Sequence, residues 1–247
     1  CVSMASSTSL ENMFEISKGQ AWLQLYIFQD ENFVMELLER AKKTGYKVVI
    51  LTVDVPILSR RARDEKNGFS YPFKMGPKQF FDFATHPQWS LATLFKGIPK
   101  PMNYETSKSG KQIFKRKESR GATDWETLKR VREKWKEKLI VKGVMSSEDA
   151  VKIKNSGADA IQVSNHGGRQ LDSAIASISA LPLIRKAVGE NFPLIFDSGI
   201  RSGSDILRAF AYGANYTMIG RPLMYGIAAD AEKGLKKIVK IIKEELS

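Results

Sequence analysis

Two side chains three residues apart, His166 and Arg169, offer the clearest chemistry in the sequence. An imidazole can accept a proton near neutral pH, and a guanidinium group can bind a carboxylate through two parallel hydrogen bonds. Gly167 and Gly168 lie between them and let the backbone approach a flat ligand closely. A base and a carboxylate clamp at this spacing predict proton abstraction next to a substrate carboxylate.

The stretch that contains these residues follows the apolar run Ala160 to Val163, which predicts a buried strand opening into a loop. Polar side chains follow other apolar runs in the same way: Asp54, Lys142, Asp197 and the pair Gly220-Arg221. In a barrel of parallel strands and helices, catalytic side chains collect at the C-terminal ends of the strands. The strand ends are therefore the expected location of the functional site.

The alternation of apolar runs with amphipathic segments predicts a parallel α/β fold of the (β/α)8 TIM-barrel type. The expected strands are a stub at Val2–Ser3 and six that end near Tyr26, Asp54, Lys142, Ser164, Asp197 and Gly220. A closed barrel needs eight strands, so the first one is expected to lie upstream of Cys1. The chain is accordingly expected to be N-terminally incomplete, and to form a single domain over residues 1–247.

Composition narrows the class of protein. A charged content of 27% and the absence of an apolar run of about 18 residues predict a soluble chain without a membrane span. The single cysteine, Cys1, allows no internal disulfide and fits a reducing, cytoplasmic location. No metal site is expected, because His86 stands alone and no cysteine pair has ligand spacing. The net charge of +12 fits an anionic partner, which could be a nucleic acid, a membrane or a substrate.

The nine residues Ser-Asn-His-Gly-Gly-Arg-Gln-Leu-Asp, from Ser164 to Asp172, resemble the active-site motif of the FMN-dependent L-2-hydroxy acid dehydrogenases and oxidases. The resemblance covers essentially the whole chain and is most marked for the (S)-mandelate and L-lactate dehydrogenase branches. It implies an FMN-binding barrel that oxidises an L-2-hydroxy acid to a 2-keto acid, with a quinone or oxygen as electron acceptor. It also implies a homo-oligomer, commonly a tetramer.

The resemblance gives each strand-end residue an expected role. His166 would be the catalytic base, paired with Asp54, and Arg169 would bind the substrate carboxylate. Lys142 would lie beside the flavin ring, and Tyr26 would hydrogen-bond the substrate. From the residues alone, Asp54 could instead cap a loop, Tyr26 could be a core aromatic, and Lys142 could extend its amine to solvent.

Further positions would bind substrate or cofactor. Arg61 matches a second substrate arginine of the family, although three arginines within Arg60–Arg63 leave the register open and a solvated loop is the alternative. Ser3, Gln24 and Thr52 match flavin-ring contacts. The expected phosphate-binding residues are Asp197, Gly199, Arg201, Gly220 and Arg221. Barrels commonly bind phosphate in the loops after strands seven and eight, so this last assignment also follows from the fold alone.

A long basic and aromatic loop is expected over about 56–123. Between Lys96 and Arg120 there are eight basic residues and two acidic ones. Aromatic side chains mixed with lysines, over about 70–104, suit contact with an anionic membrane, which would place the protein on the inner face of the membrane. A flexible lid over the active site is the alternative. Nucleic acid is not an expected partner, since no recognition helix or stacking motif accompanies the charge.

Three other readings of the whole chain remain open. The chain could be a catalytically incomplete fragment, because a barrel without one strand exposes two sheet edges. It could be an FMN-dependent isomerase, although such an enzyme would not need the His–Arg pair. It could also be a non-catalytic basic module that binds membranes.

Overall fold

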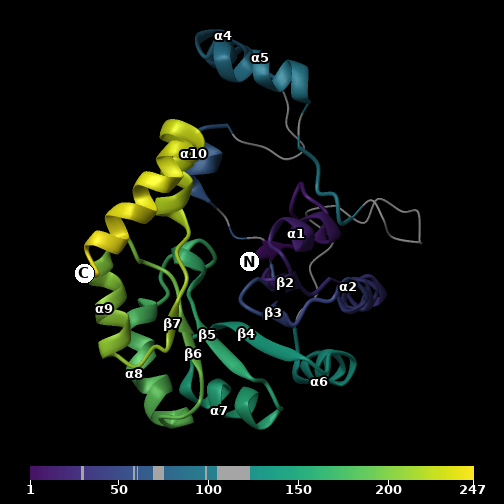
Figure 1. Cartoon of the computed structure of the whole chain (residues 1–247), viewed down its shortest axis with the longest axis vertical. Coiled ribbons are helices and arrows are strands. Elements are labelled where there is room, and N and C mark those ends of the chain that lie inside the picture. The colour runs from purple at the N-terminus through teal and green to yellow at the C-terminus, as the bar shows by residue number, and fades with distance from the viewer. Residues whose placement is uncertain (29–30, 58, 60, 69–74, 98, 105–122) are drawn as a thin grey trace.

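The computed structural model of the chain describes residues 1–28, 31–57, 59, 61–68, 75–97, 99–104 and 123–247. Seven parallel strands form one curled sheet, and their order in space is their order in the sequence (Figure 1). The strands are β1 (Val2–Ser3), β2 (Leu23–Tyr26), β3 (Val48–Thr52), β4 (Lys138–Val144), β5 (Ala160–Val163), β6 (Leu194–Phe196) and β7 (Tyr216–Thr217). Parallel neighbours in sequential order are the pattern of a (β/α)8 barrel.

Helices follow the strands and cover the outer face of the sheet. They are α1 (Leu10–Ile16), α2 (Glu31–Thr44), α6 (Trp125–Lys134), α7 (Ser147–Asn155), α8 (Ser177–Val188), α9 (Gly203–Ala211) and α10 (Arg221–Glu244). Capping side chains fix several of the helix starts: Asp124 accepts a hydrogen bond from the Thr127 amide at 2.7 Å, and Ser202 with Asp205 forms a capping box for α9.

The apolar core has two parts. The larger part lies between the sheet and the outer helices and contains fully buried residues such as Leu25, Leu51 and Val141. The smaller part lies on the inner face of the sheet and consists of Ile50, Ile140, Ala160 and Ile195. Polar side chains lie farther along the same strands, so the inner face is apolar in its lower part and polar at the C-terminal strand ends.

The predicted barrel with one strand fewer than a closed one agrees with this sheet, which has β1 and β7 at its two ends. The predicted strand positions also agree, with one difference at the last strand. β7 ends at Thr217 rather than near Gly220, although Met218 still donates its amide to the Phe196 carbonyl at 2.9 Å.

The described residues of the 56–123 segment, which was expected to be one long loop, include three short helices, and this corrects that prediction. They are α3 (Ala62–Lys66), α4 (Pro77–Thr85) and α5 (Pro87–Lys96). Proline in the first turn starts α4 and α5, and His86 separates them. Figure 1 shows this helical hairpin standing away from the sheet. Most of the expected basic stretch, residues 105–120, and the expected aromatic residues Tyr71 and Phe73 lie outside the described residues.

The 56–123 segment, called the insertion below, contacts the barrel again at Asn103, which is fully buried. The Asn103 side chain accepts a hydrogen bond from the Leu10 amide at 2.9 Å and donates to the Met4 carbonyl at 3.2 Å. Next to it, Tyr104 packs against Phe28 and Phe33 with ring centroids 5.8 and 5.5 Å away. The base of the insertion is therefore attached to the loop that follows β1.

Candidate active site

The C-terminal ends of the strands enclose a pocket of about 330 Å³. Its lining comes from six of the seven described strands, β2 to β7, or from the loops that follow them, and also includes Cys1. Of the predicted site residues, Gln24, Lys142, His166, Arg169, Asp197, Gly199, Arg201, Gly220 and Arg221 line it. The pocket therefore brings together residues that lie almost 200 positions apart in the sequence.

The turn that carries His166 and Arg169 has an uncommon backbone. His166, Gly167 and Gly168 have φ values of +59°, +69° and +72°. A positive φ suits glycine but strains a residue with a Cβ, and such strain is often found at functional sites. Asn165 holds the turn, because its side-chain oxygen accepts the Gly168 amide at 3.1 Å.

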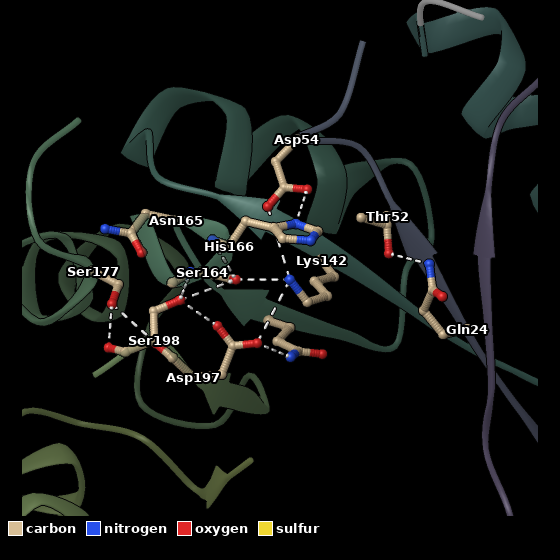
Figure 2. A network of polar contacts seen from close by, with 12 residues as sticks. Gln24, Thr52, Asp54, Lys142, Ser164, Asn165, His166, Ser177, Asp197 and Ser198 are labelled. Carbon is tan, nitrogen blue, oxygen red and sulfur yellow. Dashed lines mark hydrogen bonds and ion pairs between the residues drawn. The ribbon is translucent and has the colours of Figure 1, made fainter. Parts of the chain in front are cut away.

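His166 is paired with Asp54, as Figure 2 shows. The distance from His166 Nδ1 to Asp54 Oδ1 is 2.9 Å. An ionised carboxylate can only accept, so it fixes the proton on Nδ1 and leaves Nε2 as the proton acceptor. Only 12% of the Asp54 side chain is exposed, so solvent screens the pair weakly.

A bulge in β4 makes room for Asp54. The pairing of β4 with β5 shifts between Lys142 and Val144, and Gly143 between them has a φ of +102°. A Cβ added to Gly143 would lie 2.5 Å from the Asp54 Cβ. Only glycine allows the backbone of β4 to approach Asp54 this closely.

Lys142 lies at the centre of the polar network drawn in Figure 2. Its Nζ donates to Ser164 Oγ at 2.8 Å and lies 3.8 Å from Asp54 Oδ2 and 3.6 Å from Asp197 Oδ2. Only 14% of the side chain is exposed, and these polar partners offset the cost of placing an amine in such a site. The alternative in which Lys142 extends its amine to solvent does not match this geometry.

Three predicted ring-binding residues form a row across β1, β2 and β3. Ser3 donates to Gln24 Oε1 at 2.8 Å, and Gln24 Nε2 donates to Thr52 Oγ1 at 2.8 Å. Gln24 and Thr52 are buried. Each side chain orients the next, which prepares a polar edge for a flat ligand.

The predicted phosphate loops lie at the other end of the pocket. Gly199 has a φ of +110° with open space where a Cβ would be, and Arg201 begins the turn before α9. Arg221 starts α10 and donates from Nη2 to the Gly167 carbonyl at 2.9 Å. This bond connects the phosphate loops to the turn that carries His166.

The substrate-binding predictions have different outcomes. Arg169 is exposed and lines the pocket. The Tyr26 ring stacks near His166, with centroids 6.4 Å apart and an interplanar angle of 26°. Arg61 Nη1 lies 3.8 Å from Asp64 Oδ2. Neither Arg61 nor Tyr26 is among the described residues that line the pocket, although Tyr26 is next to His166. The structure therefore brings Tyr26 and Arg169 to the site, and the role of Arg61 stays a prediction.

The sequence analysis assigned no role to several residues of this network, among them Ser198 and Gln162. Ser198, at a φ of +76°, accepts the Gly167 amide at 2.9 Å and donates to Asp197 Oδ1 at 2.7 Å. Gln162 Nε2 donates to Asp197 Oδ2 at 2.7 Å. A polar side chain inside the otherwise apolar run of β5 was the available signal for Gln162. Ser198 had none, because its role depends on a loop from another strand.

These features define a class of ligand-binding protein. A parallel α/β barrel sheet carries an oriented base, a buried cation and an exposed arginine at one end of a pocket, and glycine and arginine loops at the other. Such a pocket suits a ligand with a flat polar ring and a phosphate, next to a carboxylate substrate.

The comparisons place the chain in a family. The profile of the family described as FMN-dependent dehydrogenase matches residues 1–247, so the chain belongs to this FMN-dependent family. An L-lactate dehydrogenase of Haemophilus influenzae is 36% identical over 99% of this chain and 66% of its own length. An (S)-mandelate dehydrogenase of Pseudomonas putida is 35% identical over 99% of this chain and 63% of its own length. The chain thus spans just under two thirds of these relatives.

Solved structures agree with the fold. The crystal structure of a monotopic membrane protein, (S)-mandelate dehydrogenase, matches with a TM-score of 0.91 and 36% identity, over 99% of this chain and 66% of that one. A mandelate oxidase with (S)-2-phenylpropionate matches with a TM-score of 0.78 and 32% identity, over 99% and 62%. No helix among the described residues is long and apolar enough to cross a membrane.

The residues present fit FMN. Hydrogen-bonding side chains of Gln24 and Thr52 suit the polar edge of the ring, and Lys142 would supply a cation to a ring bound there. Arg201 and Arg221 suit the phosphate dianion. Gln162 Oε1 is buried without a hydrogen-bond partner among the described residues, which fits a site that is completed by a ligand.

Proposed function

We propose that this chain carries the cofactor and substrate site of an enzyme that oxidises an L-2-hydroxy acid to the 2-keto acid with FMN. The observation that supports this most is the His166–Asp54 pair at 2.9 Å, in the same pocket as Lys142 and Arg169. An isomerase with a similar barrel would not need a base and a carboxylate clamp in this arrangement.

Each residue has a stated task in this proposal. Arg169 binds the substrate carboxylate and orients the hydroxyl-bearing carbon. His166 Nε2 accepts one of the two protons that the substrate loses, and Asp54 stabilises the resulting imidazolium. The Tyr26 hydroxyl donates a hydrogen bond to the substrate. FMN, when bound, would take up the two electrons and the other proton, and Lys142 would supply positive charge beside it.

The test is a visible spectrum of the purified chain with FMN, before and after anaerobic addition of L-mandelate or L-lactate. Bleaching with either acid supports the proposal, and the more effective acid identifies the substrate class. The variant His166→Gln should bind FMN and bleach about 10²- to 10⁴-fold more slowly, the usual contribution of a general base. A bound flavin that neither acid bleaches would mean that this chain is catalytically incomplete.

We also propose that the hairpin of α4 and α5 contacts an anionic membrane. Phe80, Phe81, Trp89, Leu94 and Phe95 are exposed, as are Lys78, Lys96 and Lys100. Apolar side chains mixed with cations suit the interface of an anionic bilayer. A lid over the pocket would instead pack its apolar side chains, and the hairpin stands away from the sheet (Figure 1). Membrane contact also favours a quinone over oxygen as electron acceptor.

Vesicle sedimentation tests the membrane contact. Phe95 is 83% exposed, and Phe95→Glu should reduce binding to anionic phospholipid vesicles because it places a charge among the apolar side chains. Ile16→Glu is the matched control, since Ile16 is 72% exposed on α1, outside the hairpin. Equal binding by both variants and the parent chain would contradict this role of the hairpin.

A further inference from the structure

Two buried side-chain oxygens of the site have no hydrogen-bond partner among the described residues: Asp54 Oδ2, which has Lys142 Nζ at 3.8 Å, and Oε1 of Gln162, on the inner face of the sheet. Gln162 has no such cation beside its oxygen among the ion pairs of the described residues. It lies in the middle of β5 and is 1% exposed. Its Nε2 donates to Asp197 Oδ2 at 2.7 Å, whereas Oε1 is buried with no hydrogen-bond partner among the described residues. Reversing the amide would place its oxygen against a carboxylate oxygen, so the position of Oε1 is fixed. A buried acceptor without a donor destabilises a fold, which indicates a partner supplied from outside.

The position of Gln162 along the sheet identifies the part of a ligand that it would meet. The residues suited to the flavin ring lie on β1 to β4, and those suited to the phosphate follow β6 and β7. β5 lies between these groups, where Gln162 is paired in register with Lys142 of β4 and Ile195 of β6. FMN joins its ring to its phosphate through a polyol chain. A ligand that spans the pocket in this direction therefore places its polyol next to Gln162.

The chemistry of this part of the pocket matches a polyol. Gln162 Oε1 and the Asp197 carboxylate beside it both accept hydrogen bonds and cannot donate them. Hydroxyl groups are the donors that such a pair of acceptors needs. We propose that Gln162 Oε1 accepts a hydrogen bond from a polyol hydroxyl of FMN, while its amide nitrogen holds Asp197 in place. This inference rests on the proposed binding of FMN.

Binding of three flavins distinguishes a contact with the polyol from contacts with the ring or the phosphate. FMN has all three parts, riboflavin lacks the phosphate, and lumiflavin has neither phosphate nor polyol. Dissociation constants follow from quenching of flavin fluorescence by the purified chain. Gln162→Leu keeps nearly the same volume and removes both polar atoms. It should weaken FMN and riboflavin each by about tenfold, as expected for one lost hydrogen bond, and leave lumiflavin unchanged.

Two further variants make the result decisive. Ile195→Val changes packing on the neighbouring strand without touching a polar atom, so it should leave all three constants unchanged. Gln162→Asn withdraws the amide by one methylene and provides the test if the leucine variant fails to fold. It should likewise weaken the binding of FMN and riboflavin and leave that of lumiflavin unchanged. Equal weakening of all three flavins, weakening of FMN alone, or no weakening would overturn the inference. Failure of the parent chain to bind FMN would instead overturn the proposed cofactor, and the inference with it.

Discussion

Replacing Gly143 by alanine should displace the partner of the proposed catalytic base without removing any functional group. The added Cβ would lie 2.5 Å from the Asp54 Cβ and 2.9 Å from the Asp54 backbone nitrogen. Real Cβ atoms do not approach other atoms so closely, and a backbone nitrogen cannot rotate away as a flexible side chain can. Asp54 and the bulge in β4 must therefore separate.

The size of the effect follows from two contributions. The left-handed backbone alone costs a residue with a Cβ about 1–2 kcal/mol. Gly189 provides the matched control, because its φ is +86° and a Cβ there would meet no atom within 4 Å. Gly189→Ala therefore shows the cost of backbone strain alone, and any additional loss in Gly143→Ala comes from the displacement of Asp54.

The displacement should affect catalysis more than stability. The His166–Asp54 distance is 2.9 Å, so a shift of about 1 Å breaks this hydrogen bond, and a misplacement of that size can cost about 100-fold in rate. The rate of anaerobic flavin bleaching by L-mandelate or L-lactate measures the loss, and urea denaturation measures stability. If Gly143→Ala bleaches within about threefold of Gly189→Ala, the bulge does not position Asp54 as argued.

Three more outcomes can be checked with the same methods. Ser198→Gly should keep or raise the free energy of unfolding, because glycine suits a φ of +76°. It should nevertheless slow flavin bleaching by about tenfold, because the Gly167 amide loses its acceptor. An unchanged bleaching rate would show that Ser198 is not a positioning residue. Burial opposes ionisation of Asp159, but hydrogen bonds from the Leu139 amide and two neighbouring cations lower its pKa. The stabilisation by ionised Asp159 is thus complete above the ordinary pKa of 3.8 and lost as the pH falls through the lowered pKa. Asp159→Asn should therefore cost about 2 kcal/mol of unfolding free energy at pH 7 and reduce the loss of stability on acidification. An equally steep loss in the variant would assign the acid sensitivity to other groups. Finally, FMN at 100 times its dissociation constant should raise the free energy of unfolding by about 2.7 kcal/mol, and an unchanged denaturation midpoint would count against FMN binding.

The strand ends could be predicted from the sequence because burial and strand geometry are local properties. Apolar runs such as Val48 to Val53 identify a strand, and a parallel sheet brings the C-terminal strand ends together. The local pattern thus predicts that Asp54 and His166 both follow strands, and the family resemblance implied that they are paired. The resemblance of the Ser164–Asp172 stretch to a known motif supplied the roles.

Features that depend on distant contacts were not predictable in the same way. Asn103 is fully buried because Leu10 and Met4 bond to it, and no pattern around Asn103 signals those partners. The helices α3, α4 and α5 were missed because they are short, with 5, 9 and 10 residues, and because α4 and α5 begin at prolines that are typical of loops. The bulge at Gly143 depends on the pairing of β4 with β5, which a single sequence does not reveal.

Lys142 connects the two carboxylates of the site. Its Nζ lies 3.8 Å from Asp54 Oδ2 and 3.6 Å from Asp197 Oδ2. Asp54 contacts His166, whereas Asp197 accepts hydrogen bonds from Gln162 and Ser198. Because one cation lies next to both carboxylates, the position of Asp197 bears on that of Asp54, and through Asp54 on the orientation of the proposed base.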